Sequence, residues 1–359
     1  MYFKVLVLFL ALPFLLGYDA LQQTKRDEQA PDHPDESPII EETKGEDENT
    51  KADTKRSLKG YRSKTKQSFG DLSLELAKLH ILEETVKKSK AITSLQDEVN
   101  ENSQDKCTKI KKVGEPIVHH HSGYYYGTWM RDPLGLLGPE KIWYMNNFYG
   151  NKVLEFEDMD HFKAGEVAKT YTLPYGFDGS GSVVYGRYLY FNRANSKYIV
   201  QYDLVKEKVT RQAYPHGSIK PRKYYYPLSS RNTMDLSVDE SGLWALYSYS
   251  SYSGKLCATQ LDPLTLSTLH TFCRVSSEPM TSMGNAFVAC GVVYSIDTYS
   301  SGTTTINYAY DTTTRSGTNP GIKFVNKFGY NSMVTYNPRE KVLYAWDNKR
   351  QITYPLEFE

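Results

Sequence analysis

Hydrophobic and polar residues alternate in short runs over the last two thirds of the chain, and one aromatic-rich run occurs five times. Its copies lie roughly 50 residues apart, at residues 142–145, 188–191, 243–247, 292–295 and 342–346. A short apolar run precedes each copy, and another follows it after a polar turn. Three successive strands with tight turns, repeated five times, predict the blades of a five-bladed β-propeller.

An all-β fold of another kind would also contain short alternating strands. A sandwich of two β-sheets is the main alternative. A sandwich gives no reason for a five-fold repeat, however, so the repeat favours the propeller.

The fifth blade lacks a fourth strand of its own, because the sequence reaches Glu359 just after that blade's third strand. The first four blades each have a further segment for this outer position. We therefore expect the missing strand to come from ahead of the first blade, from residues 109–113 or 116–118. Closing the ring in this way would remove an exposed sheet edge that could otherwise pair with another chain.

The N-terminal residues are typical of a secretory signal peptide, which we place at residues 1–20. An apolar run at 5–16 is too short to span a bilayer, and the small residues Gly17 and Ala20 follow at cleavage distance. No later stretch is long and apolar enough to cross a membrane. These features predict an exported protein, located in the extracellular space, without a membrane span.

Residues 21–70 are rich in Glu, Asp, Lys, Ser and Pro. Such a composition buries too little apolar surface to offset the entropy lost on ordering, so we expect a disordered charged segment. The formal net charge of the whole chain is +1. A balance so close to zero argues against a nucleic-acid partner bound by bulk electrostatics.

Residues 71–104 are predicted to be helical, because leucine and valine recur there every three or four positions with Glu and Lys between them. The positions concerned are Leu72, Leu76, Leu79, Leu82 and Val86. Self-association of residues 71–100 as a short coiled coil would bury this stripe and give a homo-oligomer. Since Ser89 and Thr93 interrupt the heptads, a helix that forms only in part is the alternative.

The four cysteines predict two disulfides in an oxidising compartment. Cys257 lies on the third strand of the third blade, and Cys273 ends its outer strand. Because these strands are antiparallel neighbours, we expect the two cysteines to pair. Cys107 would then pair with Cys290 and tether the start of the propeller to the fourth blade.

Several phrases within the repeats resemble an olfactomedin domain. They are 113–116 (Val-Gly-Glu-Pro), 127–133 (Gly-Thr-Trp-Met-Arg-Asp-Pro), 235–244, 285–291, 332–338 and 341–347 (Lys-Val-Leu-Tyr-Ala-Trp-Asp). We assign residues 105–359 to this domain. The resemblance implies a five-bladed propeller, secretion or cell-surface location, frequent N-terminal coiled coils and a disulfide between the positions of Cys107 and Cys290.

The resemblance also implies a calcium ion near the propeller axis. Its ligands would be Asp235, Asn285, Thr335 and the carbonyl oxygens of Ala286 and Val334, which we expect at the start of the innermost strands of blades three to five. The family's calcium binders carry an aspartate where this chain has Thr335. Because calcium prefers several oxygen ligands with carboxylates among them, we expect binding to be weak. The alternative is that Asp235 and Asn285 are buried polar residues satisfied by hydrogen bonds and water.

Two functions fit these features. The first is a secreted interaction protein whose propeller binds extracellular proteins, either matrix components or receptor ectodomains, in adhesion or signalling. The alternative is a calcium-dependent hydrolase with the ion as Lewis acid. That chemistry needs a histidine or a carboxylate pair beside the metal, and the channel positions offer Asp235 alone. Adjacent residues on an extended strand also point to alternate faces, so we expect the tract His119–His121 to be a solvated lead-in that forms no metal site without other ligands. We therefore expect no enzymatic activity.

Overall fold

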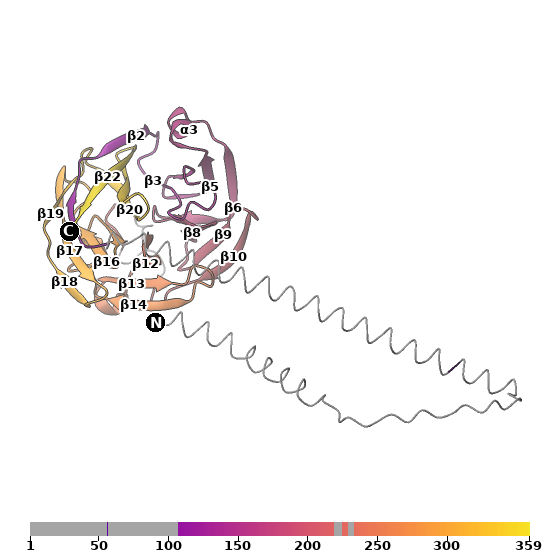
Figure 1. Ribbon diagram of the computed structural model, residues 1–359. Helices are drawn as coiled ribbons and strands as arrows, with labels where there is room; N and C mark the ends of the chain where they lie inside the picture. Colours follow the sequence, from indigo (N-terminus) through magenta and orange to yellow (C-terminus); the bar gives the residue numbers. More distant parts are fainter. Residues whose placement is uncertain (1–55, 57–106, 219–224, 229–232) are drawn as a thin grey trace, which may run out of the picture. The chain divides into compact units, whose positions relative to one another are not determined.

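The computed structural model describes Arg56 and residues 107–359, except 219–224 and 229–232. The predicted signal peptide, charged segment and amphipathic helix lie outside these residues. Over 107–359 the strands form five antiparallel sheets arranged in a ring, which confirms the five-bladed propeller (Figure 1).

Each of the first three blades is a meander of four strands that runs from the axis outward. Blade one contains β3 (Gly127–Met130), β4 (Ile142–Asn146), β5 (Tyr149–Phe156) and β6 (Lys169–Asp178). Blade two contains β7 (Val183–Tyr185), β8 (Tyr188–Asn192), β9 (Ile199–Asp203) and β10 (Lys208–Ala213). Blade three contains β11 (Met234–Asp239), β12 (Gly242–Ser248), β13 (Leu256–Leu261) and β14 (Thr268–Cys273).

The outer strand of blade four is divided in two. The blade contains β15 (Asn285–Ala289), β16 (Val292–Ile296) and β17 (Thr303–Asp311), followed by β18 (Ser316–Thr318) and β19 (Ile322–Val325). Both short strands pair with β17, β18 at its C-terminal end and β19 at its N-terminal end. The division lies at Pro320 and Gly321, since proline has no amide hydrogen for the ladder and Gly321 has a positive φ of 60°.

Blade five is completed by the start of the propeller, as the sequence predicts. Its own strands are β20 (Asn331–Asn337), β21 (Val342–Asp347) and β22 (Arg350–Phe358). Both candidate segments pair with β22: β1 (Ile110–Val113) with its last residues and β2 (Ile117–His121) with its first. The two strands therefore act together as one outer strand, and β22 is covered along its length (Figure 1).

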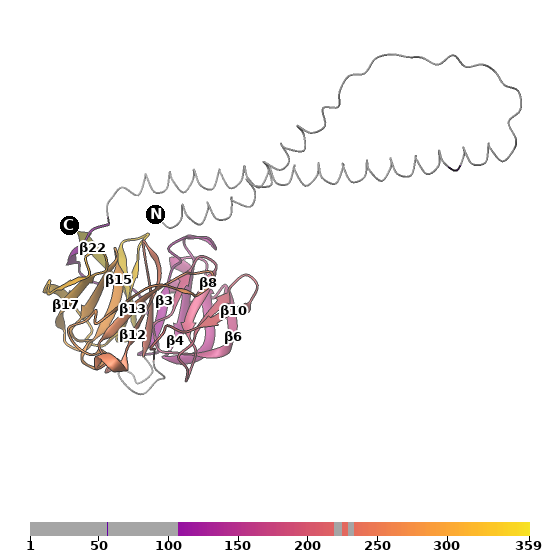
Figure 2. The ribbon, with the colours of Figure 1, turned by 90° about the horizontal axis from the view of Figure 1, so that it is seen from below.

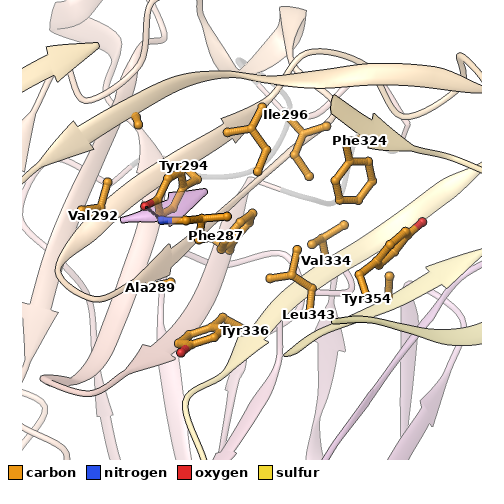
Figure 3. Close-up of a cluster of buried hydrophobic side chains, with 14 of the residues drawn as sticks. Phe287, Ala289, Val292, Tyr294, Ile296, Phe324, Val334, Tyr336, Leu343 and Tyr354 are labelled. Carbon is orange, nitrogen blue, oxygen red and sulfur yellow. Dashed lines mark hydrogen bonds between the residues drawn. The ribbon is translucent and has the colours of Figure 1, made fainter. Parts of the chain in front are cut away.

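The hydrophobic core lies between the blades. A cluster between blades four and five contains Phe287, Tyr294, Tyr336 and Tyr354, each at most 1% exposed (Figure 3). Ile110 of β1 belongs to the same cluster, and its amide donates to the Tyr294 hydroxyl at 2.9 Å. Burial of each such side chain contributes on the order of 1.5–3 kcal/mol. The closing strand is thus fixed by packing as well as by its ladder.

Both disulfides are present, with the two pairings that the sequence predicts. Cys257 and Cys273 are direct cross-strand partners on β13 and β14, with their Cα atoms 4.0 Å apart. Cys107, just ahead of β1, is bonded to Cys290 in the turn between β15 and β16. The second bond closes a loop with a sequence separation of 183 residues.

One helix among the described residues was not predicted. Helix α3 (Met159–Ala164) connects β5 to β6. The Asp158 carboxylate caps its N-terminus by accepting from the amides of Asp160 and His161, both at 3.0 Å, and Gly165 ends it with φ 75°. Phe162 is buried and stacks on Trp129 with ring centroids 5.4 Å apart, so the helix packs onto the cluster between blades one and five.

The direction of the strands divides the connections between two faces of the ring (Figure 2). Turns after the first and third strand of each blade lie at one end, and turns after the second and fourth lie at the other. The first end, here called the aliphatic face, has exposed side chains at Leu134, Leu136, Val167, Val205 and Leu264. The second end, here called the tyrosine face, has them at Tyr124, Tyr125, Tyr149, Tyr198 and Tyr214.

Candidate functional site

The innermost strands bring most of the predicted calcium ligands together in the central channel, toward the tyrosine face. Asp235 of β11, Asn285 of β15, and Val334 and Thr335 of β20 line one small cavity. Ala286 is buried next to Asn285 but is not among the residues that line it. The cavity measures about 10 Å³, which is roughly the room of one water molecule or one ion.

Two of these positions, Val334 and Thr335, lie further along their strand than expected. Asp235 and Asn285 are the second and first residues of their strands, but Thr335 is the fifth residue of β20 because that strand begins at Asn331. Thr335 reaches the cavity from within the strand. Its side chain is 7% exposed, and its hydroxyl has no hydrogen-bond partner among the residues that the structure describes.

Burial raises the pKa of Asp235 from its ordinary value to about 7. The hydroxyl of the buried Tyr226 lies near the Asp235 carboxylate and opposes this shift. It has no regular hydrogen bond to a residue that the structure describes. Asp235 forms no ion pair within the described part of the chain. A cation in the cavity would hold this carboxylate ionised, since an adjacent positive charge stabilises the charged form.

The donor set suits a weakly bound calcium ion. Asp235 supplies one carboxylate and Thr335 a hydroxyl without a partner among the described residues, and Val334 lines the same cavity. Asn285 is less available, because its Oδ1 accepts from the Ala286 amide at 2.9 Å. With one anionic ligand instead of two or three, such a site provides little charge compensation for a divalent ion.

Other residues at or beside this cavity were not found from sequence. Ser180 and Gly181, ahead of β7, line it from the side of blade two, and Tyr226 is buried beside Asp235. A Cβ on Gly181 would overlap Asp235, and the Gly181 carbonyl accepts from the Leu236 amide at 3.0 Å. The glycine is required for this close approach of two backbones, and the Gly-Ser sequence 179–182 is the only sequence signal for it.

On the aliphatic face, the Asp132 carboxylate organises the loop between β3 and β4. It is 1% exposed and accepts from the amides of Leu134 at 3.0 Å, Leu136 at 2.9 Å and, in the next blade, Gly186 at 2.8 Å. The loop is thereby attached to blade two. Leu134 and Leu136 remain 50% and 68% exposed, so the loop presents apolar side chains on a fixed backbone.

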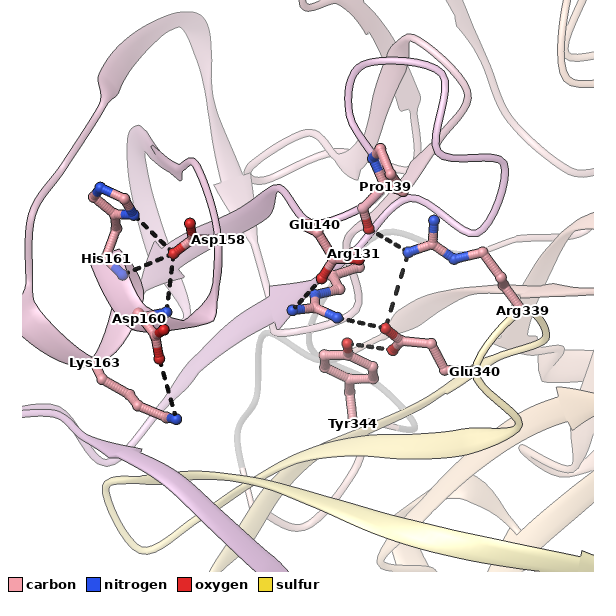
Figure 4. Close-up of polar contacts among 10 residues, drawn as sticks. All are labelled: Arg131, Pro139, Glu140, Asp158, Asp160, His161, Lys163, Arg339, Glu340 and Tyr344. Atoms are coloured by element: carbon pink, nitrogen blue, oxygen red, sulfur yellow. Dashed lines mark hydrogen bonds and ion pairs between the residues drawn. The ribbon is translucent and has the colours of Figure 1, made fainter.

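A polar network beside this loop joins the first blade to the fifth (Figure 4). Arg131 donates to Glu340 at 2.7 Å and pairs with Glu140 at 3.2 Å. Glu340 also accepts from the Tyr344 hydroxyl at 2.5 Å, and Arg339 donates to the Pro139 carbonyl. The same face therefore contains both a rigid apolar loop and the contacts that support it.

The histidine tract makes hydrogen bonds within blade five. His119 Nε2 lies 2.8 Å from Thr353 Oγ1, and His120 Nδ1 lies 2.8 Å from Gln351 Oε1. Over the residues that the structure describes, one group of metal-ligating side chains is close enough to share an ion, namely Cys107, Glu240 and Cys290. Both of its sulfurs belong to a disulfide, which leaves Glu240 alone.

The fold and the channel define a five-bladed propeller with an axial polar cavity. The chain belongs to the olfactomedin-like domain family, whose model matches residues 102–359. It is 35% identical to myocilin of Canis lupus familiaris over 264 residues, and 34% identical to myocilin of Macaca fascicularis over 258 residues. These alignments cover 72% and 70% of this chain but 54% and 52% of the relatives. The chain thus spans about half the length of the myocilins that it matches.

Among solved structures, a glutaminyl cyclase of Myxococcus xanthus aligns with 68% of this chain and 96% of its own, at 10% identity and a TM-score of 0.42. Such a score carries no functional argument. No helix in the described part of the chain has both the length and the apolar character to cross a membrane.

Proposed function

We propose that this chain is an exported protein whose propeller binds extracellular proteins in adhesion or signalling. Membership of the olfactomedin-like family and two disulfides support this role, because disulfides persist in oxidising compartments outside the cytosol. The observation that carries the proposal is the loop 131–141, in which Asp132 fixes the backbone and leaves two leucines exposed.

A fixed loop with exposed apolar side chains suits protein recognition for a physical reason. Binding orders the groups at an interface, and a loop that is already ordered loses less entropy. Large exposed side chains on such loops provide the buried anchors on which affinity depends. The hydrogen bonds to Asp132 order the backbone of this loop, and Leu134 and Leu136 provide the side chains that a partner would bury.

The experiment compares two matched variants of the secreted full-length chain. Leu136→Asp changes the loop 131–141 that Asp132 holds in place. Leu264→Asp changes a leucine on another blade of the aliphatic face, and this leucine is 63% exposed. Both are tested for binding to a panel of matrix proteins and receptor ectodomains. We expect Leu136→Asp to weaken binding at least about tenfold and Leu264→Asp to leave it unchanged. No binding across the panel, or equal loss in both variants, would contradict the proposal.

We also propose weak calcium binding at the channel cavity and self-association through residues 71–100. The cavity supports the first, because Asp235 and the unpaired Thr335 hydroxyl face it together. The leucine spacing of the sequence supports the second, which would multiply binding sites on one particle. Light scattering of the full chain and of a form beginning at Asp105 tests it: equal oligomeric states in both would exclude this segment.

We propose that this chain has no enzymatic role. A calcium-dependent hydrolase needs a general acid or base beside the ion. The residues lining the cavity offer Asp235 as their one carboxylate and contain no histidine in the described structure. Esterase and lactonase assays with calcium test this part of the proposal, and metal-dependent turnover would overturn it.

A further inference from the structure

A groove at the tyrosine face of blade one has the properties of a ligand site. It measures about 300 Å³ and lies where β4 turns into β5. This volume is at the lower end of the range for small-molecule sites. Its polar and aromatic lining consists of Tyr124, Asn146, Asn147, Tyr149, Asn151 and Lys152.

Two tyrosine rings border the groove. Tyr124 is 48% exposed and Tyr149 is 50% exposed, so each presents ring surface to solvent. The backbone of Tyr124 is fixed from two sides: its amide donates to Ser122 Oγ at 2.9 Å, and its carbonyl accepts from Trp346 Nε1 at 3.0 Å. Rings on an ordered backbone make contact area at little entropic cost.

Amide groups provide the polar part of the lining. Asn146 Oδ1 is buried without a hydrogen-bond partner among the residues that the structure describes, although buried polar atoms are nearly always paired. Asn147 Oδ1 accepts from the Phe148 amide at 2.9 Å, which orients its amide NH₂ group. Asn151 is exposed on β5. The amides of Asn147 and Asn151 thus supply donors and acceptors at the groove, whereas Asn146 Oδ1 lies beneath its surface.

The charge of the groove restricts the ligand. No carboxylate lines it, and its single cation, Lys152, donates to Thr172 Oγ1 at 2.5 Å across the β5–β6 pair. Recognition of a phosphate or sulfate normally uses several cations or a fork of guanidinium donors. A neutral ligand with apolar faces and many hydroxyl groups fits better, because rings pack against its C–H surfaces and amides bond its hydroxyls as both donors and acceptors.

We propose that this groove binds a neutral oligosaccharide. Tyr124 and Tyr149 pack against the sugar rings, and Asn147 and Asn151 hydrogen-bond the hydroxyls. The site is separate from the proposed protein contact, since Leu134 and Leu136 lie on the aliphatic face. Failure of one proposal therefore leaves the other intact.

The test uses the full-length chain and defined probes. Pentasaccharides of glucose, mannose, galactose and N-acetylglucosamine are titrated by calorimetry, with a heparin pentasaccharide as the anionic comparison. We expect saturable binding of at least one neutral probe. We expect Tyr124→Ala and Tyr149→Ala each to weaken it about tenfold, as the loss of one ring contact of roughly 1.4 kcal/mol would do.

The matched control is Tyr214→Ala. Tyr214 is 44% exposed on the same face, but it lies at the end of β10 outside the groove. This variant should bind as the wild type does. Asn151→Ala serves as a second groove variant at an exposed position, where folding is not at risk, and it should also weaken binding. Three results would overturn the proposal: no neutral probe binds at millimolar concentration, heparin alone binds, or Tyr214→Ala weakens binding as much as the groove variants do.

Discussion

Arg131 of the first blade donates from Nη1 to Oε1 of Glu340 in the fifth blade, at 2.7 Å and across 209 positions of the chain. The two side chains are 13% and 22% exposed. The pair joins the first blade to the fifth, in which the ring closes. Without Glu340, the largely buried Arg131 would keep the exposed Glu140, at 3.2 Å, as a charged partner, and the Tyr344 hydroxyl would lose its acceptor.

Glu340→Ala should therefore destabilise the propeller by roughly 2 kcal/mol, below the range for fully buried pairs because both groups keep some contact with water. Urea unfolding followed by tryptophan fluorescence measures the change. Lys112→Ala is the control: Lys112 pairs with Glu357, but both side chains are more than half exposed, at 61% and 57%. An equal effect in the two variants would show that the blade contact contributes no more than a surface pair.

Gly181→Ala should destabilise the propeller by roughly 1–3 kcal/mol, since the added methyl group would overlap Asp235 on the neighbouring inner strand. Gly302→Ala is the control, because a Cβ there meets no atom within 4 Å and the backbone φ is not positive. The melting temperatures of the two variants test this prediction. A stable Gly181→Ala chain would mean that blades two and three are not this close at the channel.

The raised pKa of Asp235 gives stability a pH dependence in chelated buffer. Below about pH 4 the carboxyl is protonated in both the folded and the unfolded chain. Between about 4 and about 7 the folded state keeps a proton that the unfolded state has released, so the contribution of Asp235 to stability falls as pH rises. Above about 7 this contribution is constant.

Asp235→Asn removes this contribution. We expect the wild type to lose stability relative to the variant between pH 4 and pH 7, as measured by urea unfolding in EDTA. Parallel stability curves for the two proteins would show that the Asp235 carboxyl titrates as it does in water.

Thr335→Asp should strengthen calcium binding by at least about tenfold, because it adds a carboxylate at a cavity that has one. Calorimetric titration with calcium measures the affinity, and Thr335→Asn is the control of nearly equal size without charge. The Asp235→Asn chain should not respond to calcium. Equal affinities in the two Thr335 variants would place the ion elsewhere or nowhere in the propeller.

The repeat along the sequence predicts most of the fold because a propeller is built from local hairpins. The strands at 142–146 and 342–347 pair with segments a few residues away, and their nearly continuous apolar sequences reflect burial on both faces between blades. Ring closure was also predictable, from the lack of a fourth strand after β22. The pairing of both β1 and β2 with β22 could not be predicted from the sequence. Their register depends on contacts about 240 residues apart, such as Lys112 with Glu357.

The details of the site were harder to predict because they depend on the paths of connections. Tyr226 reaches Asp235 from the long connection between β10 and β11, where no periodic pattern constrains the chain. Helix α3 has only six residues, too few for a helical repeat to show. Asp132 lies in a recognisable Asp-Pro turn, but its third amide partner, Gly186, belongs to the next blade.

Hydrogen exchange of β1 tests the account most directly, because the whole architecture depends on this strand closing the ring. The amide of Gly114 donates to the Pro355 carbonyl at 2.8 Å, and residues 110–113 pair with the end of β22. In the full chain we predict that the amides of Ile110 and Gly114, which donate to the Tyr294 hydroxyl and the Pro355 carbonyl, exchange as slowly as those of β21, on the time scale of global unfolding. Exchange of these amides within seconds, while β21 stays protected, would contradict a propeller closed by its own N-terminal strand.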